Sequence, residues 1–462
     1  GGLTTLGEVE AVPLLTLDSG PAGGVLGSVF FSRLYGHGEV ICSDMGGTSF
    51  DVSLIKAGEP TLDEQPVLDK YTFLIPKIAI QSIGAGGGSI VWADEDGLLR
   101  VGPESAGSMP GPACYDRGGE RPTVTDVDLI LGYLNPENFL GGRTQLRRGL
   151  AEKALEPVAR RLGMDLYQAA AGAFRIVNAQ MADLIRKTTI EQGYDPRNFV
   201  LFCYGGAGPT HSPFLGRELR IREICVPGYA TVFSALGMLT GGLVHVAEAS
   251  YPATLPLSPA EVDGLTRLFG ELDERLTAQF DREGVPRERV TRSAFLFMKY
   301  RLQPKGMAVP LDGVASLADQ GGLAETFHRQ YAELYGEISA YRQMAIELLT
   351  CRMVGRGESI APRFVSDLTP TAEYPSSAFA GERPAYFEEA KAFVSTPVFD
   401  GGRLVFGHRL DGPCIVERPG DTLVIPPGMQ GVVDQLHNIR IERIEARLWT
   451  RSRSKSCDTA CG

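Results

Sequence analysis

The sequence predicts an α/β protein with a lobe of the nucleotide-binding type, followed by a smaller β-rich C-terminal domain. Three observations lead to this fold class. Two strand-like runs, 39–43 and 52–55, are joined through a glycine pair. An apolar run at 199–204 leads into a Gly-rich turn and a helix from about Thr210, an order typical of nucleotide-binding lobes. Short strand-like runs alternate with turns over 403–441.

The first observation predicts a β-hairpin whose turn lies between Asp44 and Asp51. The backbone amides of Gly46 and Gly47 can close round a phosphate, because glycine has no Cβ to hold the ligand away. Thr48 adds a hydroxyl donor, and the two aspartates can hold a hydrated Mg²⁺ ion. An ordinary Gly-rich hairpin turn remains the alternative for this segment alone.

The other expected elements follow from local patterns. In order, they are a helix from the Gly20-Pro21 turn, a strand at 78–83 that runs into the glycines of 84–88, a long buried helix at 169–190, helices at 259–282 and 324–335, and a strand at 346–354. The Gly- and Pro-rich stretch 103–128 is expected to be an ordered loop, of the kind that often serves an active site.

Composition limits the partners and the compartment. A formal net charge of -11 argues against binding nucleic acid or an anionic membrane. No signal peptide and no run of 18 apolar residues is present, so a cytoplasmic location is expected. Most cysteines lie singly in apolar runs, where reduced thiols are the rule. The pair Cys457 and Cys461 is weak evidence for a metal site.

A chain of 462 residues is too long for one hydrophobic core. The expected division is a remnant of a preceding lobe with a linker at 1–38, an ATPase lobe at 39–245, a mixed α/β segment at 246–343, a β-rich domain at 344–445 and a disordered tail at 446–462. No Met precedes Gly1, so we expect the chain to be a fragment of a longer polypeptide.

Several motifs, taken in order, resemble the hydantoinase A/5-oxoprolinase family of ATP-dependent enzymes. They are SGPAGG (19–24), DMGGTSFDVSLI (44–55), SIGAGGGSI (82–90), GPACY (111–115), PTVTD (122–126), YGGAGPTH (204–211) and FSALG (233–237), with weaker matches in DGPCIVE (411–417) and VIPPG (424–428). The resemblance therefore extends over nearly the whole chain.

The resemblance implies an actin-like fold, in which two ribonuclease-H-like lobes close over ATP and Mg²⁺. Residues 44–51 would be the second phosphate hairpin, with Gly46, Gly47, Thr48 and Asp51 at the phosphates. Gly205, Gly206 and Gly208 would form the adenosine turn. The first lobe would lie upstream of Gly1, so this chain alone is expected to show little or no ATPase activity.

The family chemistry implied by the resemblance uses ATP to phosphorylate a carbonyl oxygen of a cyclic amide or a ketone. A hydantoinase B-type subunit would complete the reaction, which implies a hetero-oligomer. The substrate is then a small cyclic amide, or a ketone if the chain serves an ATP-dependent carboxylase. A non-catalytic ATP-responsive module and an inactive truncated remnant are the remaining alternatives.

Five side chains are candidates for catalysis, metal binding or buried polar contacts, and four of them have a structural alternative. Asp44 and Asp126 are the proposed catalytic residues, although Asp126 can equally cap the helix before Leu129. His211 could join Asp44 at a metal ion or pack at the start of its helix. Cys114 could be a nucleophile or a buried thiol. Asn178 is expected to be a buried polar group that needs partners.

Overall fold

A computed structural model describes residues 3–63, 66–73, 76–304, 306–357 and 369–444. The chain forms two compact units that interleave in sequence. The smaller unit combines Gly1–Leu17 with Thr240–Ala361, and the larger unit combines Asp18–Leu239 with Pro362–Gly462. The tail expected at 446–462, including both of its cysteines, lies outside the described residues.

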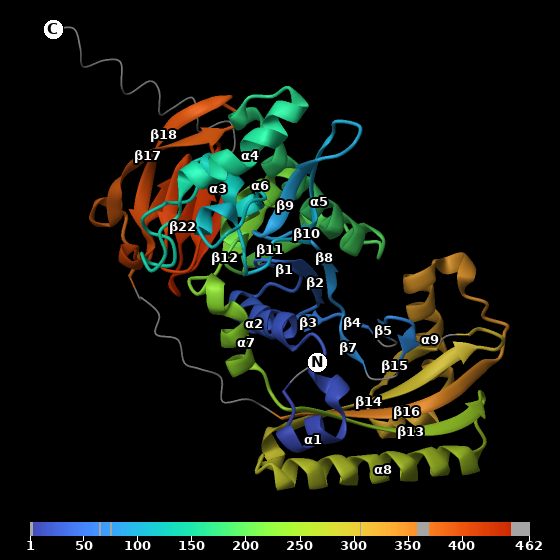
Figure 1. Cartoon of the computed structure of the whole chain (residues 1–462). Coiled ribbons are helices and arrows are strands. Elements are labelled where there is room, and N and C mark those ends of the chain that lie inside the picture. The colour runs from blue at the N-terminus through green and yellow to red at the C-terminus, as the bar shows by residue number, and fades with distance from the viewer. Residues whose placement is uncertain (1–2, 64–65, 74–75, 305, 358–368, 445–462) are drawn as a thin grey trace. The chain divides into compact units, whose positions relative to one another are not determined.

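The larger unit is built on a mixed sheet of nine strands (Figure 1). Its path runs β19-β22-β23-β12-β11-β1-β2-β3, and β8 also pairs with β2. The strands are β1 (Val40–Met45), β2 (Phe50–Lys56), β3 (Glu59–Pro60), β8 (Gln81–Ile83), β11 (Val200–Tyr204), β12 (Glu223–Val226), β19 (Arg409–Asp411), β22 (Met429–Val433) and β23 (Ile439–Arg443). β1 is antiparallel to β2 but parallel to β11, which in turn is parallel to β12.

Among the described residues, six α-helices begin within this unit. They are α2 (Ser19–Tyr35), α3 (Val124–Ile130), α4 (Arg148–Leu162), α5 (Leu166–Ile190), α6 (Gly208–Leu219) and α7 (Phe233–Thr240). The predicted long buried helix is confirmed as α5, which starts at a capping box between Asp165 and Gln168 and packs against α3, α4 and α6. The helix predicted from the Gly20-Pro21 turn is α2, and it begins at Ser19.

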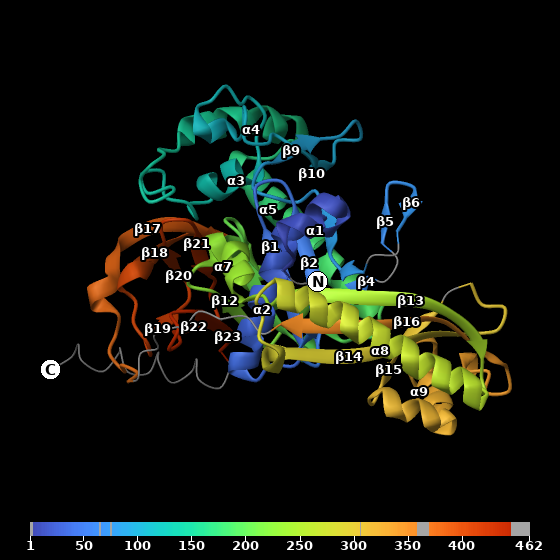
Figure 2. The ribbon, with the colours of Figure 1, turned by 90° about the horizontal axis from the view of Figure 1, so that it is seen from below.

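Smaller sheets complete the larger unit. A four-stranded sheet contains β17 (Phe379–Phe387), β18 (Ala392–Asp400), β20 (Cys414–Glu417) and β21 (Thr422–Ile425), drawn in orange to red in Figure 2. Two-stranded pairs are formed by β4 (Leu62–Asp63) with β7 (Lys77–Ile78), β5 (Val67–Leu68) with β6 (Tyr71–Thr72), and β9 (Ser89–Ala93) with β10 (Leu99–Ser105).

The smaller unit has its own four-stranded sheet and its own core. Its elements are α1 (Leu6–Ala11), β13 (Val244–Thr254), α8 (Pro259–Arg282), β14 (Val290–Tyr300), β15 (Met307–Leu311), α9 (Gln320–Tyr335) and β16 (Ile346–Gly357). α8 runs along this sheet in Figures 1 and 2 and packs on β13 and β16. It buries an apolar stripe at helical spacing, so the helix predicted at 259–282 is confirmed: Leu265, Phe269, Leu272, Leu276 and Phe280.

The two units do not coincide with the five segments expected from the sequence. The strand at 346–357 pairs with β13 and β14 and therefore belongs to the smaller unit. β23 instead pairs with β12, so part of the expected C-terminal domain extends the large sheet. Strand pairing over such sequence separations leaves no local signal that could have placed the boundaries. None of the helices in the described part is long and apolar enough to cross a membrane.

Candidate functional site

The predicted hairpin is confirmed at the end of β1. Asp44 is the register partner of Asp51 across the two antiparallel strands, and the Gly46 amide closes the turn by donating to the Ser49 carbonyl at 3.1 Å. Gly47 lies exposed at the tip of the turn. A Cβ built on Gly46 or Gly47 would meet no described atom within 4 Å. The turn therefore faces open space.

A second Gly-rich loop, residues 84–88, forms hydrogen bonds with the carbonyl groups of this turn. The amide of Gly87 donates to the Gly46 carbonyl at 3.0 Å, and the amide of Gly88 donates to the Gly47 carbonyl at 2.6 Å. In a trans peptide the C=O and the following N–H point in opposite directions. Because both carbonyls point into the loop, the amides of Gly47 and Thr48 point away from it. These two N–H groups are therefore available to an anion in front of the turn.

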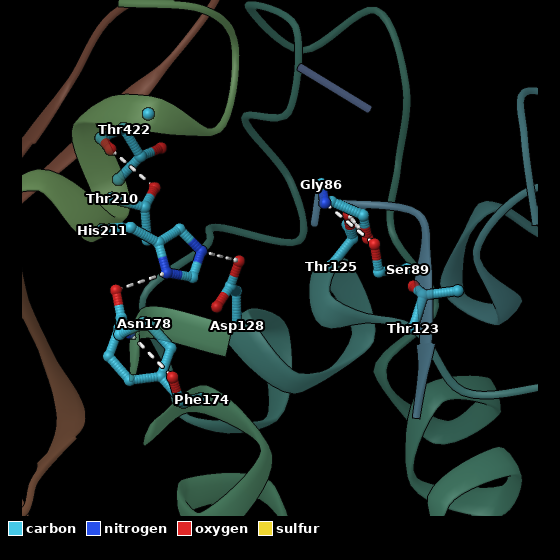
Figure 3. A network of polar contacts seen from close by, with 12 residues as sticks. Gly86, Ser89, Thr123, Thr125, Asp128, Phe174, Asn178, Thr210, His211 and Thr422 are labelled. Carbon is cyan, nitrogen blue, oxygen red and sulfur yellow. Dashed lines mark hydrogen bonds and ion pairs between the residues drawn. The ribbon is translucent and has the colours of Figure 1, made fainter. Parts of the chain in front are cut away.

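The loop is itself anchored to helix α3. The hydroxyl and the amide of Thr125 both donate to the Gly87 carbonyl at 2.8 Å, and the Gly86 amide donates to Ser89 Oγ at 2.8 Å (Figure 3). A Cβ on Gly86 would lie 2.7 Å from the Thr48 nitrogen, so glycine is required there. No role for this loop follows from the sequence. Its run of three glycines was the signal, but the partner of the loop was not visible from the sequence.

The predicted Gly-rich turn at 205–208 lies beside the hairpin. β1 and β11 are parallel neighbours, so both strands end at the same edge of the sheet. The Ala207 amide donates to the Met45 carbonyl at 3.0 Å. Gly205 has a φ of +85° and lies so close to Asp44 that a Cβ would overlap the carboxylate. The structure thus brings the two predicted turns together, and α6 begins at Gly208.

Two carboxylates carry unfavourable charge at this edge. Burial raises the pKa of Asp44 to about 6, a hydrogen bond from Ser234 at 3.2 Å opposes that rise, and the nearby charge of Asp51 adds to it. Burial also raises the pKa of Asp51, against hydrogen bonds from Ser82 and Ser49. A bound cation would relieve both effects, so the pair fits a hydrated Mg²⁺ ion. Ser234 was not among the predicted site residues.

Asp126 organises the Gly/Pro loop. It is the third residue of α3 and forms a capping box with Thr123, the true N-cap. Its carboxylate also accepts from the amides of Ala113 at 3.2 Å and Cys114 at 2.7 Å. These contacts explain a structural role, and the catalytic role stays a prediction. Burial and the Asp126 charge raise the pKa of the Cys114 thiol, so it remains protonated and gains no nucleophilic character.

His211 of α6 lies in a buried polar network with side chains of α3 and α5 (Figure 3). Its Nδ1 is 3.2 Å from Asn178 Oδ1 and its Nε2 is 3.4 Å from Asp128 Oδ2, while its ring stacks on Phe174 with centroids 4.8 Å apart. The side chain is fully buried. Within the described residues, these ring contacts come from α3 and α5 rather than from the hairpin. A role as metal ligand stays a prediction, and this packing does not favour it.

Family models and known proteins match almost the whole chain. The model of the hydantoinase/oxoprolinase domain matches residues 1–246, and that of the hydantoinase/oxoprolinase C-terminal domain matches 258–444. The acetophenone carboxylase gamma subunit of Aromatoleum aromaticum is 34% identical over 442 residues, which is 91% of this chain and 58% of that protein. The caprolactamase subunit alpha of Pseudomonas jessenii is 32% identical over 440 residues, or 94% of this chain and 62% of that protein.

A solved structure agrees with these matches. The crystal structure of the ATP-dependent caprolactamase from Pseudomonas jessenii superposes with a TM-score of 0.79 at 31% identity, covering 92% of this chain and 61% of that one. The chain therefore spans about three fifths of the length of these relatives.

Proposed function

This chain belongs to the hydantoinase/oxoprolinase family of ATP-dependent enzymes, and on that premise we propose that it is part of a cyclic-amide hydrolase of the hydantoinase or 5-oxoprolinase type. In this proposal the enzyme uses ATP to phosphorylate the carbonyl oxygen of its substrate. A neutral amide carbonyl is a poor electrophile, and phosphorylation converts its oxygen into a leaving group that a later hydrolytic step can expel.

The observation that carries the proposal is the pair of outward-facing amides on the hairpin turn. Gly46 and Gly47 turn their carbonyls toward Gly87 and Gly88, so the N–H groups of Gly47 and Thr48 point away from those two donors. Fixed backbone donors of this kind bind phosphate without reorganising, which suits phosphoryl transfer. The Thr48 hydroxyl adds a further donor at the exposed tip.

The neighbouring groups fit the rest of the nucleotide. Gly205, Gly206 and Gly208 would lie at the adenosine, next to the start of α6. A Cβ built on Gly206 would meet no described atom nearer than 3.9 Å, so the turn leaves room at that position, whereas Gly205 packs against the end of β1. Asp44 and Asp51 would hold the Mg²⁺ ion, which neutralises phosphate charge when it is bound. The raised pKa values of both carboxylates support this assignment, because each carries unfavourable charge without a cation.

The sheet order supports the ribonuclease-H-like assignment. β3, β2, β1, β11 and β12 lie side by side in that order, with β2 antiparallel to the parallel set of β1, β11 and β12. We accordingly propose that this part of the larger unit is one ATPase lobe of an actin-like pair. The relatives named above are subunits of larger enzymes, and a B-type partner subunit is therefore part of the proposal.

An ATP-dependent ketone carboxylase is the second candidate. One observation favours it: the chain is about as similar to an acetophenone carboxylase subunit as to a caprolactamase subunit, at 34% and 32% identity. The two functions share ATP use and differ in the acceptor, so the nucleotide turns alone do not separate them.

The test measures substrate-dependent ATP hydrolysis by the full-length enzyme with its partner subunit. Hydantoin, 5-oxoproline and caprolactam are compared with acetone and acetophenone in the presence of bicarbonate. Stimulation by a cyclic amide supports the first proposal, and stimulation by a ketone with bicarbonate supports the second. Asp44→Asn should abolish the stimulated turnover in either case. Undiminished turnover in that variant would remove Asp44 from the mechanism.

A further inference from the structure

Three side chains from separate segments of the smaller unit meet at His245. Glu8 lies on α1, His245 on β13, and Glu283 directly follows α8. One ligand atom from each residue lies within 4.8 Å of the other two. The His245 side chain is only 2% exposed, and that of Glu283 is 11% exposed. We propose that these residues form a binding site for a divalent transition-metal ion, with Zn²⁺ and Mn²⁺ as the best candidates.

The charges at this site are not balanced by the protein. His245 Nε2 is 2.7 Å from Glu283 Oε2, and His245 Nδ1 is 3.2 Å from Glu8 Oε2. A neutral imidazole carries one N–H and can donate to only one carboxylate. Even an imidazolium supplies one positive charge against two negative ones. Among the described residues, both carboxylates have their ion pairs with His245 alone. A divalent cation would balance both.

Gln279 of α8 shows which ring nitrogen faces the ion. Its amide nitrogen lies 3.0 Å from His245 Nδ1 and also contacts Glu8. An amide N–H can donate to Nδ1 only if that nitrogen carries a lone pair, which leaves the ring proton on Nε2 for Glu283. A histidine that donates one N–H to a carboxylate and directs its other nitrogen at a metal is the usual arrangement of histidine ligands.

This tautomer places the lone pair of Nδ1 and the Glu8 carboxylate around the same point. Imidazole and carboxylate together suit Zn²⁺ and Mn²⁺, whereas Ca²⁺ and Mg²⁺ prefer oxygen ligands alone. The bound ion would tie the N-terminal segment to β13 and α8.

The experiment is a calorimetric titration of the metal-free 462-residue chain with ZnCl₂. The background carries Cys457→Ser and Cys461→Ser, so that thiols of the C-terminal segment do not bind zinc. We expect one equivalent of Zn²⁺ to bind and the melting temperature to rise. Glu8→Gln and His245→Gln should each weaken the affinity at least about tenfold. Glu10→Gln, at an exposed position of the same helix, is the matched control and should bind like the parent.

Glu8 is 32% exposed, so its amide variant should fold even if a substitution at His245 does not. Circular dichroism checks this before titration. Zinc binding that Glu8→Gln leaves unchanged would overturn the proposal, because the ion would then lie elsewhere. No binding at about 1 mM ZnCl₂ would overturn it as well, since such an affinity is too weak for a built site. Neither result bears on the ATP-dependent function, whose proposed residues lie in the larger unit.

Discussion

Replacing Gly205 with alanine would place a methyl group against the Asp44 carboxylate. The new Cβ would overlap Asp44 Oδ1 and the Met45 carbonyl oxygen and lie 2.7 Å from the Met45 carbonyl carbon. The residue also has a φ of +85°, a conformation that alanine adopts at a cost. Either the 205–208 turn or the end of β1 must therefore move.

The magnitude follows from these two effects. The left-handed conformation costs a non-glycine residue about 1–2 kcal/mol. Forcing an extra carbon into a packed site costs about 1–3 kcal/mol more. The free energy of unfolding should thus fall by about 2–5 kcal/mol. With a shift of about 2 °C per kcal/mol for a unit of this size, the melting temperature should fall by about 4–10 °C.

Gly206→Ala is the matched control one residue away. Gly206 does not have a positive φ, and the nearest described atom to its Cβ would be the Gly420 carbonyl oxygen at 3.9 Å. That variant should melt within about 2 °C of the parent, because restricting the unfolded chain offsets any small loss.

Calorimetry of the ligand-free chain measures the stability of both variants. The rate of ATP hydrolysis by the full-length enzyme measures the activity of the proposed site. Gly205→Ala should lose turnover because it displaces Asp44, a proposed Mg²⁺ ligand. If Gly205→Ala has the same melting temperature as the parent and as Gly206→Ala, the contact between the two turns does not exist in solution. The two turns would then not form one site.

Three further predictions follow from the same contacts. Burial raises the pKa of Asp44 from 3.8 to about 6, so the ligand-free fold loses stability as the pH rises through this interval. Asp44→Asn should therefore raise the free energy of unfolding by about 1–3 kcal/mol at pH 7.5 and leave it unchanged at pH 3. Melting curves that show the same effect at both pH values would contradict the raised pKa. Asp126→Ala leaves the amides of Ala113 and Cys114 unpaired and should cost about 2–4 kcal/mol in calorimetry, whereas full stability with lost turnover in Asp126→Asn would favour the catalytic role instead. Asn178→Leu leaves His211 Nδ1 without its partner and should cost about 1–3 kcal/mol in urea unfolding, while an unchanged midpoint would show that the buried bond contributes nothing.

The parts of the site that the sequence predicted are those with local causes. β1 and β2 pair across a turn of four residues, so their alternation and the glycine pair are read within one short window. The strand, Gly-rich turn and helix at 200–219 are equally local. At Asp126 a short-range pattern gave the helix start but not the correct cap. The Thr-x-x-Asp spacing marks Thr123 as the N-cap and Asp126 as its reciprocal partner.

What the sequence could not predict depends on contacts between distant segments. β12 and β23 pair although about two hundred residues separate them, and no property of either strand names the other. His211 on α6 contacts Asp128 on α3 and Asn178 on α5. These contacts exist only once the fold has brought the three helices together. The zinc candidate has the same origin, because a glutamate from α1, a strand histidine and a residue after α8 share no motif.

The glycine loop at 84–88 links two motifs of this chain, because it bonds both to the 44–51 hairpin and to α3. Without this loop, the Gly46 and Gly47 carbonyls would bond to water, and the amides of the turn could point in many directions. The amides of Gly87 and Gly88 take those carbonyls, and Thr125 in turn fixes the Gly87 carbonyl from α3. Each of these bonds fixes the orientation of one peptide group without placing a side chain in front of the turn. The direction of the proposed phosphate donors is therefore set by a helix about eighty residues away, while the hairpin supplies the donors themselves.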